Sequence, residues 1–453
     1  MSISEQQTVP RAPGSIPVLG HTGALWRDPL GWLRECSGQA GVLELKLRGR
    51  RGYLVADAKL AQSVLTNVSD FDKGGQIAEQ ARAVLGNGLL TCPASEHRRQ
   101  RRLMQPAFTR ERVGEAGVVM VEEAERLAGS WRDGERLDLL PLLNRLTQRV
   151  TIRSLLTSFD LSSIDEMVSV FDRLLDGEVF RHAVLPEWAR NLPLPSARRF
   201  AAAVAEADAT CAHAVASARA DPDAGGLLNA LMESVAGEEA LFSDEELKAQ
   251  VVTFLAAGTE TTASVLAWFF HRVAEDPALR ERLHAELDTV LDGRTATADD
   301  VPLLPFTNAV FAETLRVHSP TWIIARCATR EVELGGHRFP EGTEFYVSPY
   351  QLHHDPEVFP DPERFDPDRW TKRSALVPSA GYVPFGAGAR ICIGARFAQH
   401  EAVIAVSALA GRWDLRAEPD ARVRPKPRIV MAPHGLVLRA HDRRATAARG
   451  GTA

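Results

Sequence analysis

The chain has 453 residues, of which 45% are hydrophobic and 25% are charged, and its net charge is −6. This composition is typical of a globular protein that can bury a large core and enclose a cofactor. The acidic balance disfavours nucleic acid as a partner, and five scattered cysteines without a Cys-x-x-Cys pair argue against a zinc site or a disulfide framework and fit a reducing cytoplasm.

The two ends of the chain are polar. Residues 1–20 contain prolines and are expected to form a flexible arm before a single domain at 21–442, and residues 443–453 are expected to form a disordered tail. The N-terminal residues include no apolar run long enough for a signal peptide or a membrane-spanning helix. We therefore expect a cytoplasmic protein without a membrane span.

The first part of the domain alternates short helical and strand patterns. Helices are expected at 28–37 and 58–66, and a β-hairpin is expected from strands at 42–48 and 52–57. The glycine-containing stretch 70–91 is interpreted as a mobile loop with a short helix, which is a plausible lid over a pocket.

The densest basic run is EHRRQRRLMQPAF at 96–108, which we interpret as a helix. His97 and Arg101 are four residues apart and therefore lie on one face of that helix. A solvated helix face explains such a run, and DNA binding is disfavoured by the acidic balance of the whole chain. Three further arginines are candidates for an exposed basic patch, namely Arg98, Arg99 and Arg102.

The region 111–240 is dominated by helical patterns, with breaks at 193–196 and 221–226. Its apolar residues form either core or pocket wall, and the sequence does not separate these two roles. No constellation of catalytic side chains occurs in this region, so we place no site there.

The longest helical pattern runs from 243 to 277. Ser243 and Glu246 predict a capping box at its start. In its middle, AGTETT at 257–262 contains one glycine and three threonines, which are poor helix formers. Threonine hydroxyls can bond back to helix carbonyl groups and open the helix locally. Such a conflict inside a strong helix often marks function.

Another helical pattern at 304–320 contains Glu313 and Arg316, three residues apart on one face. Most such pairs are surface ion pairs, so the spacing alone is weak. Residues 321–350 alternate apolar residues with glycine turns and predict a small β-rich region. The fold class is therefore mainly α with a small β-rich region.

The most informative stretch is FGAGARICIG at 385–394, which precedes a helical pattern at 395–413. Cys392 thus lies near a helix N-terminus, where the macrodipole and free backbone N–H groups stabilise a thiolate. The glycines allow close approach to a flat ligand, and Arg390 can meet an anionic group on it. A thiolate presented in this way suits the proximal face of a haem iron. The alternative is a cysteine that only packs.

The pattern Phe385-x-x-Gly388-x-Arg390-x-Cys392-x-Gly394 resembles the haem-binding signature of the cytochrome P450 family at every defining position. The likeness covers residues 12–440 and implies the cytochrome P450 fold, a triangular helical domain that encloses haem b with Cys392 as the axial ligand of the iron. Contacts with the haem are implied for His97, Arg101, Arg326, Phe385, Gly388, Arg390 and Gly394. For His97 and Arg101, plain surface charge remains the alternative.

The resemblance also assigns roles to residues outside the cysteine loop. Glu260 and Thr261 match the acid–alcohol pair that the family places over the distal haem face to relay protons; a solvent-facing Glu and ordinary threonines are the alternative. Glu313, Arg316 and Arg369 match a buried structural triad behind the haem. Trp370 stands where many members have Phe, which is a departure from the family pattern.

For the reaction, the resemblance implies monooxygenation of an unactivated C–H bond with O2. We expect no fused flavin or ferredoxin domain, and we therefore expect electrons from a separate ferredoxin and an NAD(P)H-dependent ferredoxin reductase. An acidic ferredoxin is expected to dock where the Cys392 loop and the arginines at 98–102 offer positive charge. We expect a monomer by analogy with the family.

The expected pocket residues are largely apolar, which favours a compact hydrophobic substrate. They are Ile77, Leu85, Ala256, Ala257, Trp322, Ile323 and Ile324. The runs HRRQRRLMQPAF and NLPLPSARRF and the Trp322 segment are similar to actinobacterial members that oxidise cyclic sesquiterpenes, a reaction of secondary metabolism and antibiotic biosynthesis. A fatty acid or a polyketide remains an alternative substrate. A haem-thiolate sensor without turnover and a helical protein without haem remain alternatives from other classes.

Overall fold

The fold is known from a computed structural model, which describes most of the chain. The described residues are 8–17, 20–47, 50–157, 159–174, 194–222, 225–233, 242–371 and 376–443. Helices dominate and the strands are short, so the predicted mainly α class with a small β-rich region is confirmed. Residues 1–7, 18 and 19 of the expected arm and residues 444–453 of the expected tail lie outside the described residues.

Contacts within the chain separate two compact units. Unit 1 comprises Met1–Glu79, Ala312–Cys392 and Lys426–Met431, and unit 2 comprises Gln80–Phe311, Ile393–Pro425 and Ala432–Ala453. Each unit is described by itself below. The single domain expected at 21–442 stays a prediction.

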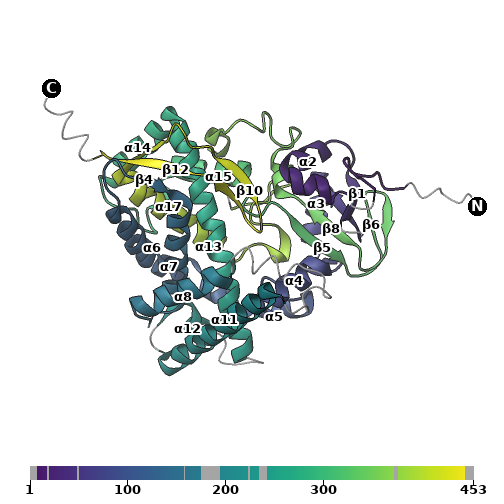
Figure 1. The fold of residues 1–453 in the computed structure, drawn as a ribbon, viewed down its shortest axis with the longest axis horizontal. Coiled ribbons are helices and arrows are strands. Elements are labelled where there is room, and N and C mark those ends of the chain that lie inside the picture. The colour runs from purple at the N-terminus through teal and green to yellow at the C-terminus, as the bar shows by residue number, and fades with distance from the viewer. Residues whose placement is uncertain are drawn as a thin grey trace, which may run out of the picture. The chain divides into compact units, whose positions relative to one another are not determined.

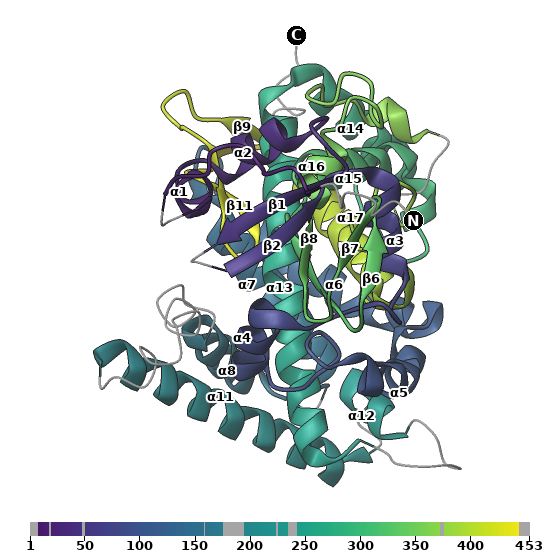
Figure 2. The ribbon, with the colours of Figure 1, turned by 90° about the vertical axis from the view of Figure 1, so that its right-hand side faces the viewer.

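Unit 1 is built around a five-stranded sheet with the strand order β1-β2-β8-β5-β3, most of which is labelled in Figure 2. The strands are β1 (Val42–Leu47), β2 (Arg50–Val55), β3 (Phe71–Asp72), β5 (Ile324–Ala328) and β8 (Glu344–Val347). β2 and β8 run parallel, and the other neighbours are antiparallel. The predicted hairpin is confirmed, although its second strand begins at Arg50 instead of residue 52.

Helices of unit 1 pack on both faces of this sheet. Leu54 and Val55 are neighbours in β2 and therefore point to opposite faces. Leu54 belongs to a hydrophobic cluster with α2, whereas Val55 belongs to a second cluster with α3. The helices and remaining strands of this unit are α1 (Thr22–Arg27), α2 (Pro29–Cys36), α3 (Ala58–Thr66), β6 (Val332–Leu334), β7 (His337–Phe339), α16 (Pro349–His353), and the 3₁₀ helices η4 (Pro367–Trp370) and η5 (Gly388–Arg390).

Two helices contain residues of both units. α4 (Gly75–Leu85) is the short helix predicted within 70–91, and α15 (Pro305–Val317) is the helix predicted at 304–320. The two-residue strand β3 precedes α4 and was not predicted from the sequence, because two residues carry no recognisable period.

Unit 2 is a helical assembly around α13 (Asp244–Glu275), which is labelled in Figure 1. This helix contacts α7 (Leu139–Leu155), α11 (Pro195–Ala220) and α17 (Ala395–Arg412). A three-stranded sheet with the order β4-β12-β9 lies in the same unit. Its other elements are α5 (Ala94–Met104), η1 (Gln105–Phe108), α6 (Arg110–Ser130), β4 (Arg136–Asp138), α8 (Leu161–Leu174), α12 (Gly226–Glu233), α14 (Pro277–Leu291), η3 (Val301–Leu303), β9 (Trp413–Ala417) and β12 (Val437–Asp442). A local hairpin is formed by β10 (Arg424–Pro427) and β11 (Met431–His434), and each of these two strands contains residues of both units.

Capping residues in the sequence explain where α13 starts and where it ends. The Ser243 hydroxyl accepts the Glu246 N–H, and the Glu246 carboxylate accepts the Ser243 N–H, so the predicted capping box is confirmed. The helix ends at Glu275, and Asp276 then caps the next helix by accepting the N–H groups of Ala278 and Leu279.

Length and apolar composition would allow α13 to cross a membrane, alone among the helices of the described residues. In its most apolar window, 61% is buried inside the protein, as in the core helix of a globular protein. One such helix is weak support for a membrane span.

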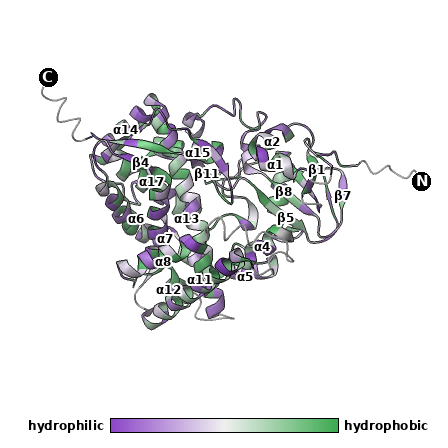
Figure 3. Cartoon of the chain, viewed as in Figure 1, coloured by the Kyte–Doolittle hydropathy of each residue, from purple (hydrophilic) through white to green (hydrophobic). Residues whose placement is uncertain are grey.

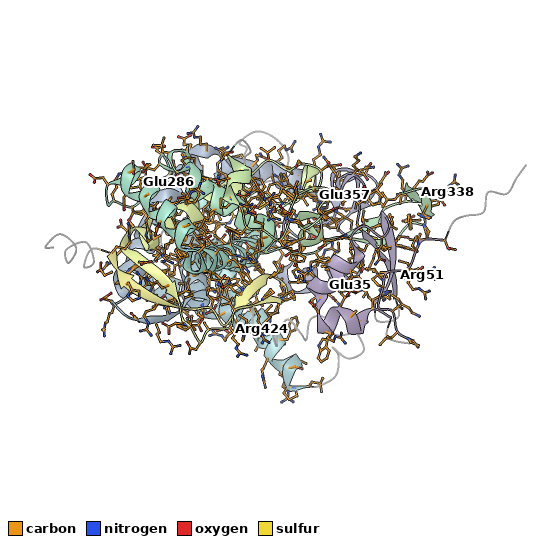
Figure 4. The ribbon with its side chains drawn as sticks, turned by 90° about the horizontal axis from the view of Figure 1, so that it is seen from above. Glu35, Arg51, Glu286, Arg338, Glu357 and Arg424 are labelled. Carbon is orange, nitrogen blue, oxygen red and sulfur yellow. The ribbon has the colours of Figure 1, made fainter. Side chains whose placement is uncertain are left out.

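Hydropathy and charge follow position within unit 1. In unit 1 the inner strand β5 is coloured hydrophobic and the small outer ladder around β7 hydrophilic in Figure 3. The charged side chains of Arg51 and Arg338 point outward from the same unit in Figure 4, and both residues are exposed. Solvated charges of this kind need no functional explanation.

Candidate active site

The loop that carries Cys392 is fixed by its own backbone. The Cys392 N–H donates to the Phe385 carbonyl oxygen at 2.9 Å, and the Gly386 N–H donates to the Val383 carbonyl oxygen at 3.0 Å. Gly386 and Gly388 have φ angles of +73° and +68°, which side chains with a Cβ rarely adopt. The loop is therefore a folded turn, and α17 begins three residues after the cysteine.

Gly388 also allows a close approach between the loop and α3. A Cβ atom at this position would lie 2.7 Å from the Thr66 Cα and 2.8 Å from the Leu65 carbonyl oxygen. At Gly386, by contrast, the nearest protein atom to such a Cβ would be the Arg390 carbonyl oxygen, 4.0 Å away. One glycine thus serves packing against α3, and the other serves the turn itself.

Cys392 differs from the other cysteines of the chain, all of which lie within the described residues. Cys392 is exposed, whereas Cys36, Cys92 and Cys211 are buried and Cys327 is half-buried. Burial raises the pKa of Cys36 and of Cys211 to about 12, so both thiols stay protonated at neutral pH. Among the five cysteines, Cys392 is therefore the one most open to a metal ion or another ligand.

Two arginines and one carboxylate lie together in unit 1. The Arg390 guanidinium donates to Asp72 Oδ1 at 2.6 Å. Arg326 on β5 is buried, its Nη1 donates to the Ala325 carbonyl oxygen at 2.9 Å, and its Nε has no hydrogen-bond partner. Burial, with Arg390 as the second cause, lowers the pKa of Arg326 to about 10, which leaves it charged at neutral pH.

This arrangement has an excess of positive charge and an unsatisfied donor. Such a donor set fits the carboxylate edge of a haem, because a buried cation without a counter-ion is costly and a propionate would supply one. Arg326 and Arg390 are therefore suited to hold the propionates, and Cys392 is suited to bind the iron.

Glu313, Arg316 and Arg369 are brought together in unit 1. Two hydrogen bonds of 2.7 and 2.9 Å join Arg316 to the two carboxylate oxygens of Glu313, and both side chains are fully buried. Arg369 Nε lies 3.6 Å from Glu313 Oε1, a looser ion pair. The departure at Trp370 adds a contact, because its indole N–H donates to Glu313 Oε2 at 2.8 Å.

Glu260 and Thr261 lie in the middle of α13, and both are half-buried. The Thr261 hydroxyl donates to the Ala257 carbonyl oxygen at 2.6 Å, and the Thr259 hydroxyl donates to the Leu255 carbonyl oxygen at 2.7 Å. The expected back-bonding is thus present, but α13 is continuous through this stretch. These residues belong to unit 2 and Cys392 to unit 1, so their joint role around a haem stays a prediction.

On α5, the basic run divides into buried and exposed members. His97 is buried and Arg101 is half-buried, while Arg98 and Arg102 are exposed. Arg99 forms an ion pair with Glu246. Arg99 therefore does not belong to a free basic patch, which corrects the expectation for this residue.

The expected pocket residues are distributed over both units, so their convergence stays a prediction. Ile77 is 47% exposed on α4, and Leu85 at the end of the same helix packs against the core of unit 2. Ala256 is half-buried and Ala257 exposed on α13. Trp322, Ile323 and Ile324 pack on the hydrophobic clusters of unit 1.

Sequence reasoning missed one titratable residue, Glu401 on α17. Its side chain is buried, and neither carboxyl oxygen has a hydrogen-bond partner of ordinary geometry. Burial raises the pKa of Glu401 well above its usual value, and the nearby Thr262 hydroxyl opposes this only weakly. The available sequence signal was a single glutamate directly before the apolar stretch that begins at residue 402.

Comparison with known proteins agrees with the geometry. The model of the cytochrome P450 family matches residues 10–440. Cyclooctatin synthase from Streptomyces melanosporofaciens is 39% identical over 93% of this chain and 93% of its own length. Pentalenene oxygenase from Streptomyces avermitilis is 38% identical over 91% of this chain and 93% of its own length. Cyclooctat-9-en-7-ol 5-monooxygenase from S. melanosporofaciens is 39% identical over 91% of this chain and 90% of its own length.

Glu401→Gln is expected to stabilise the protein at neutral pH. The folded protein holds the Glu401 proton at a pH where the unfolded chain, with a carboxyl pKa of about 4.3, has released it. The native state then binds more protons than the unfolded state, so this group lowers stability as pH rises above about 4.3, by at most about 1.4 kcal/mol per pH unit. The gain from Gln should therefore grow as pH rises above about 5, until the pH reaches the raised pKa of Glu401 in the folded protein.

Urea midpoints followed by circular dichroism across that pH range would measure the gain. Glu125→Gln removes an exposed carboxyl group from α6 and is the matched control, for which we expect no such gain. A Glu401→Gln gain that does not change with pH would contradict a protonated Glu401.

Proposed function

Because the chain belongs to the cytochrome P450 family of haem monooxygenases, we propose that Cys392 supplies the axial thiolate of its haem b. The observation that carries this proposal is the exposed Cys392 in a glycine-shaped loop of the same unit as Arg326 and Arg390. When bound, the haem supplies the activation of O2. The residues of the chain hold the cofactor, orient the substrate and move protons.

We assign proton delivery to Glu260 and Thr261. A carboxyl group and a hydroxyl group in a half-buried stretch of helix can pass protons through ordered water. The Thr261 hydroxyl already donates to the Ala257 carbonyl oxygen, so its oxygen lone pairs remain available to accept a hydrogen bond from a donor in front of the helix. Glu260 is the neighbouring acid.

For the substrate, a cyclic terpene hydrocarbon or alcohol is the class we favour, with a sesquiterpene first. The relatives that support it carry the names pentalenene oxygenase and cyclooctat-9-en-7-ol 5-monooxygenase, and each is aligned over nine-tenths of this chain. The apolar character of Trp322, Ile323 and Ile324 suits such a molecule. Fatty acids and polyketides are the alternatives.

Electrons are proposed to come from a separate acidic ferredoxin reduced by an NAD(P)H-dependent reductase. Arg98 and Arg102 are exposed on α5 and carry no ion pair within the described residues, so they can attract an acidic partner. Arg99 is excluded from this role by its contact with Glu246.

The Cys392→Ser variant tests the axial ligand. The purified protein, reduced with dithionite and treated with carbon monoxide, should show the strongly red-shifted Soret band of thiolate-ligated haem, and Cys392→Ser should lose it. Cys327→Ser is the matched control, because Cys327 is the other cysteine that is not fully buried, and it should keep the band. A band retained in Cys392→Ser would contradict the assignment, and no haem band in the parent protein would remove the proposed function.

Thr261→Ala should uncouple the reaction. With a cyclic sesquiterpene, product formation should fall about 100-fold, the lower end of what a positioned proton donor contributes, while NAD(P)H consumption continues and hydrogen peroxide accumulates. Product, NAD(P)H and peroxide are measured together. Thr259→Ala removes an equivalent back-bonded hydroxyl two residues earlier and should stay coupled. If only a fatty acid shifts the Soret band and is turned over, the terpene assignment is wrong.

Reversing charge at the proposed docking residues should slow reduction. Arg98→Glu and Arg102→Glu should each lower the rate of reduction by ferredoxin and weaken its dependence on salt, since rim charges act mainly on association. Arg198→Glu makes the same charge change at an exposed position of α11 and is the control. Rates that match the parent at every ionic strength would exclude this docking surface.

A further inference from the structure

One histidine contacts the backbone that leads into the Cys392 loop, and neither the sequence nor the family resemblance gave it a role. His353 is the last residue of α16, and it is fully buried in unit 1. Its Nε2 lies 3.0 Å from the Val383 backbone nitrogen. Its Nδ1 lies 2.8 Å from the Ser319 hydroxyl oxygen and 3.2 Å from the Arg316 carbonyl oxygen. Both ring nitrogens are therefore bonded to fixed groups.

These partners determine the tautomer of the ring. The Val383 N–H can only donate, so Nε2 must be the acceptor and Nδ1 must carry the proton. The Ser319 hydroxyl donates to the Leu315 carbonyl oxygen, which leaves its oxygen lone pairs for the Nδ1–H. Burial lowers the pKa of His353 to about 3, so the ring is neutral at the pH at which the protein works. A protonated ring would present a donor to the donor of Val383.

Val383 belongs to the backbone that shapes the cysteine loop. Its carbonyl oxygen accepts the Gly386 N–H at 3.0 Å, and two residues further on the Phe385 carbonyl oxygen accepts the Cys392 N–H at 2.9 Å. Because Val383 is buried, its own N–H would have no water to bond if His353 were absent. His353 thus satisfies the one backbone donor that anchors the start of this turn.

His353 also contacts the buried Glu313–Arg316 pair. Arg316 Nη1 donates to the His353 carbonyl oxygen at 2.9 Å, so the ion pair positions the backbone of the histidine while the ring holds Val383. The Tyr382 ring packs between the rings of His353 and Trp370, with centroid distances of 5.1 and 4.5 Å. Trp370 in turn donates to Glu313. Every contact in this set lies in unit 1.

We propose that His353 is a positioning residue for Cys392, which transmits the fixed geometry of the Glu313–Arg316 pair to the cysteine loop through the Val383 N–H. The proposal rests on the proposed role of Cys392 as the axial ligand. His353 does not touch the reacting atoms. It keeps the turn from 383 to 392 closed, so that the sulfur stays where the iron needs it.

Two amide substitutions distinguish the role of Nε2 from the role of Nδ1 in the His353 ring. The side-chain oxygen of Gln reaches the place of Nε2 and can accept the Val383 N–H, whereas the shorter Asn places its amide near Nδ1 and leaves Val383 unbonded. Hydrogen–deuterium exchange of the peptide 381–392 in the purified holoenzyme should therefore stay near that of the parent in His353→Gln. It should accelerate at least about tenfold in His353→Asn, as expected when a buried donor loses its partner.

A second readout follows the ligand itself. The carbon monoxide complex of His353→Asn should convert from the thiolate-type Soret band to the type of a histidine-ligated haem at least about tenfold faster than the parent, while His353→Gln stays close to it. His354→Asn is the matched control. His354 is also buried, but its Nδ1 bonds to the Tyr350 carbonyl oxygen of α16, the helix that His354 follows, and its ring lies 4.1 Å from the Tyr350 ring.

The outcomes are distinct. If His354→Asn accelerates exchange in 381–392 as much as His353→Asn does, the effect is general destabilisation and the proposal fails. If exchange in 381–392 stays slow in His353→Asn and accelerates in His353→Gln, the Nδ1 side of the ring holds the loop. This result would also overturn the proposal. If the parent lacks the thiolate band, the proposed ligand fails, yet the exchange measurement still decides whether His353 holds the loop.

Discussion

The buried pair of Glu313 and Arg316 is the constraint on which the geometry of unit 1 depends. Two opposite charges with no exposed surface are stable only when every donor and acceptor is satisfied, because the cost of desolvation otherwise exceeds their attraction. Arg316 meets this condition by also donating to the carbonyl oxygens of His353, Pro362 and Arg364, and Glu313 by also accepting the Asp366 N–H and the Trp370 indole N–H. The pair therefore fixes irregular backbone that no helix or strand could hold.

Around Arg326 and Arg390, in the same unit, the hydrogen-bond donors are not all satisfied. Arg390 donates to the Asp72 carboxylate, whereas the Arg326 Nε is buried without a partner. A buried donor without an acceptor is costly for the protein alone. Such exceptions to the pairing of buried polar groups occur mainly at functional sites. The hydrogen bonds around Glu313 and Arg316 are satisfied within the protein, whereas the proposed haem would supply the acceptor that Arg326 lacks.

Much of this could be predicted from the sequence, because its signals are local. Capping by Ser243 and Glu246, the helix that carries Glu313 and Arg316, and the glycine turn around Cys392 all depend on residues close together in the chain. Contacts between distant segments were not predictable. The sequence offers no period that would pair Arg390 with Asp72 or Arg99 with Glu246, and the latter pair removed one arginine from an expected surface patch. Burial of Glu401 was missed for the same reason.

The buried titratable groups also show that residue type alone does not determine whether a side chain is charged. Burial favours a protonated Glu401 and a neutral His353, since the charged form of each would lose its hydration without gaining a counter-ion. For His353 neutrality has a structural consequence, because only the neutral ring has a lone pair for the Val383 N–H. Arg316 acts in the same direction, because a cation so close to the ring disfavours a second positive charge there. Arg316 thus fixes the backbone of His353 through its carbonyl oxygen and, at the same time, favours the neutral ring whose lone pair the Val383 N–H needs.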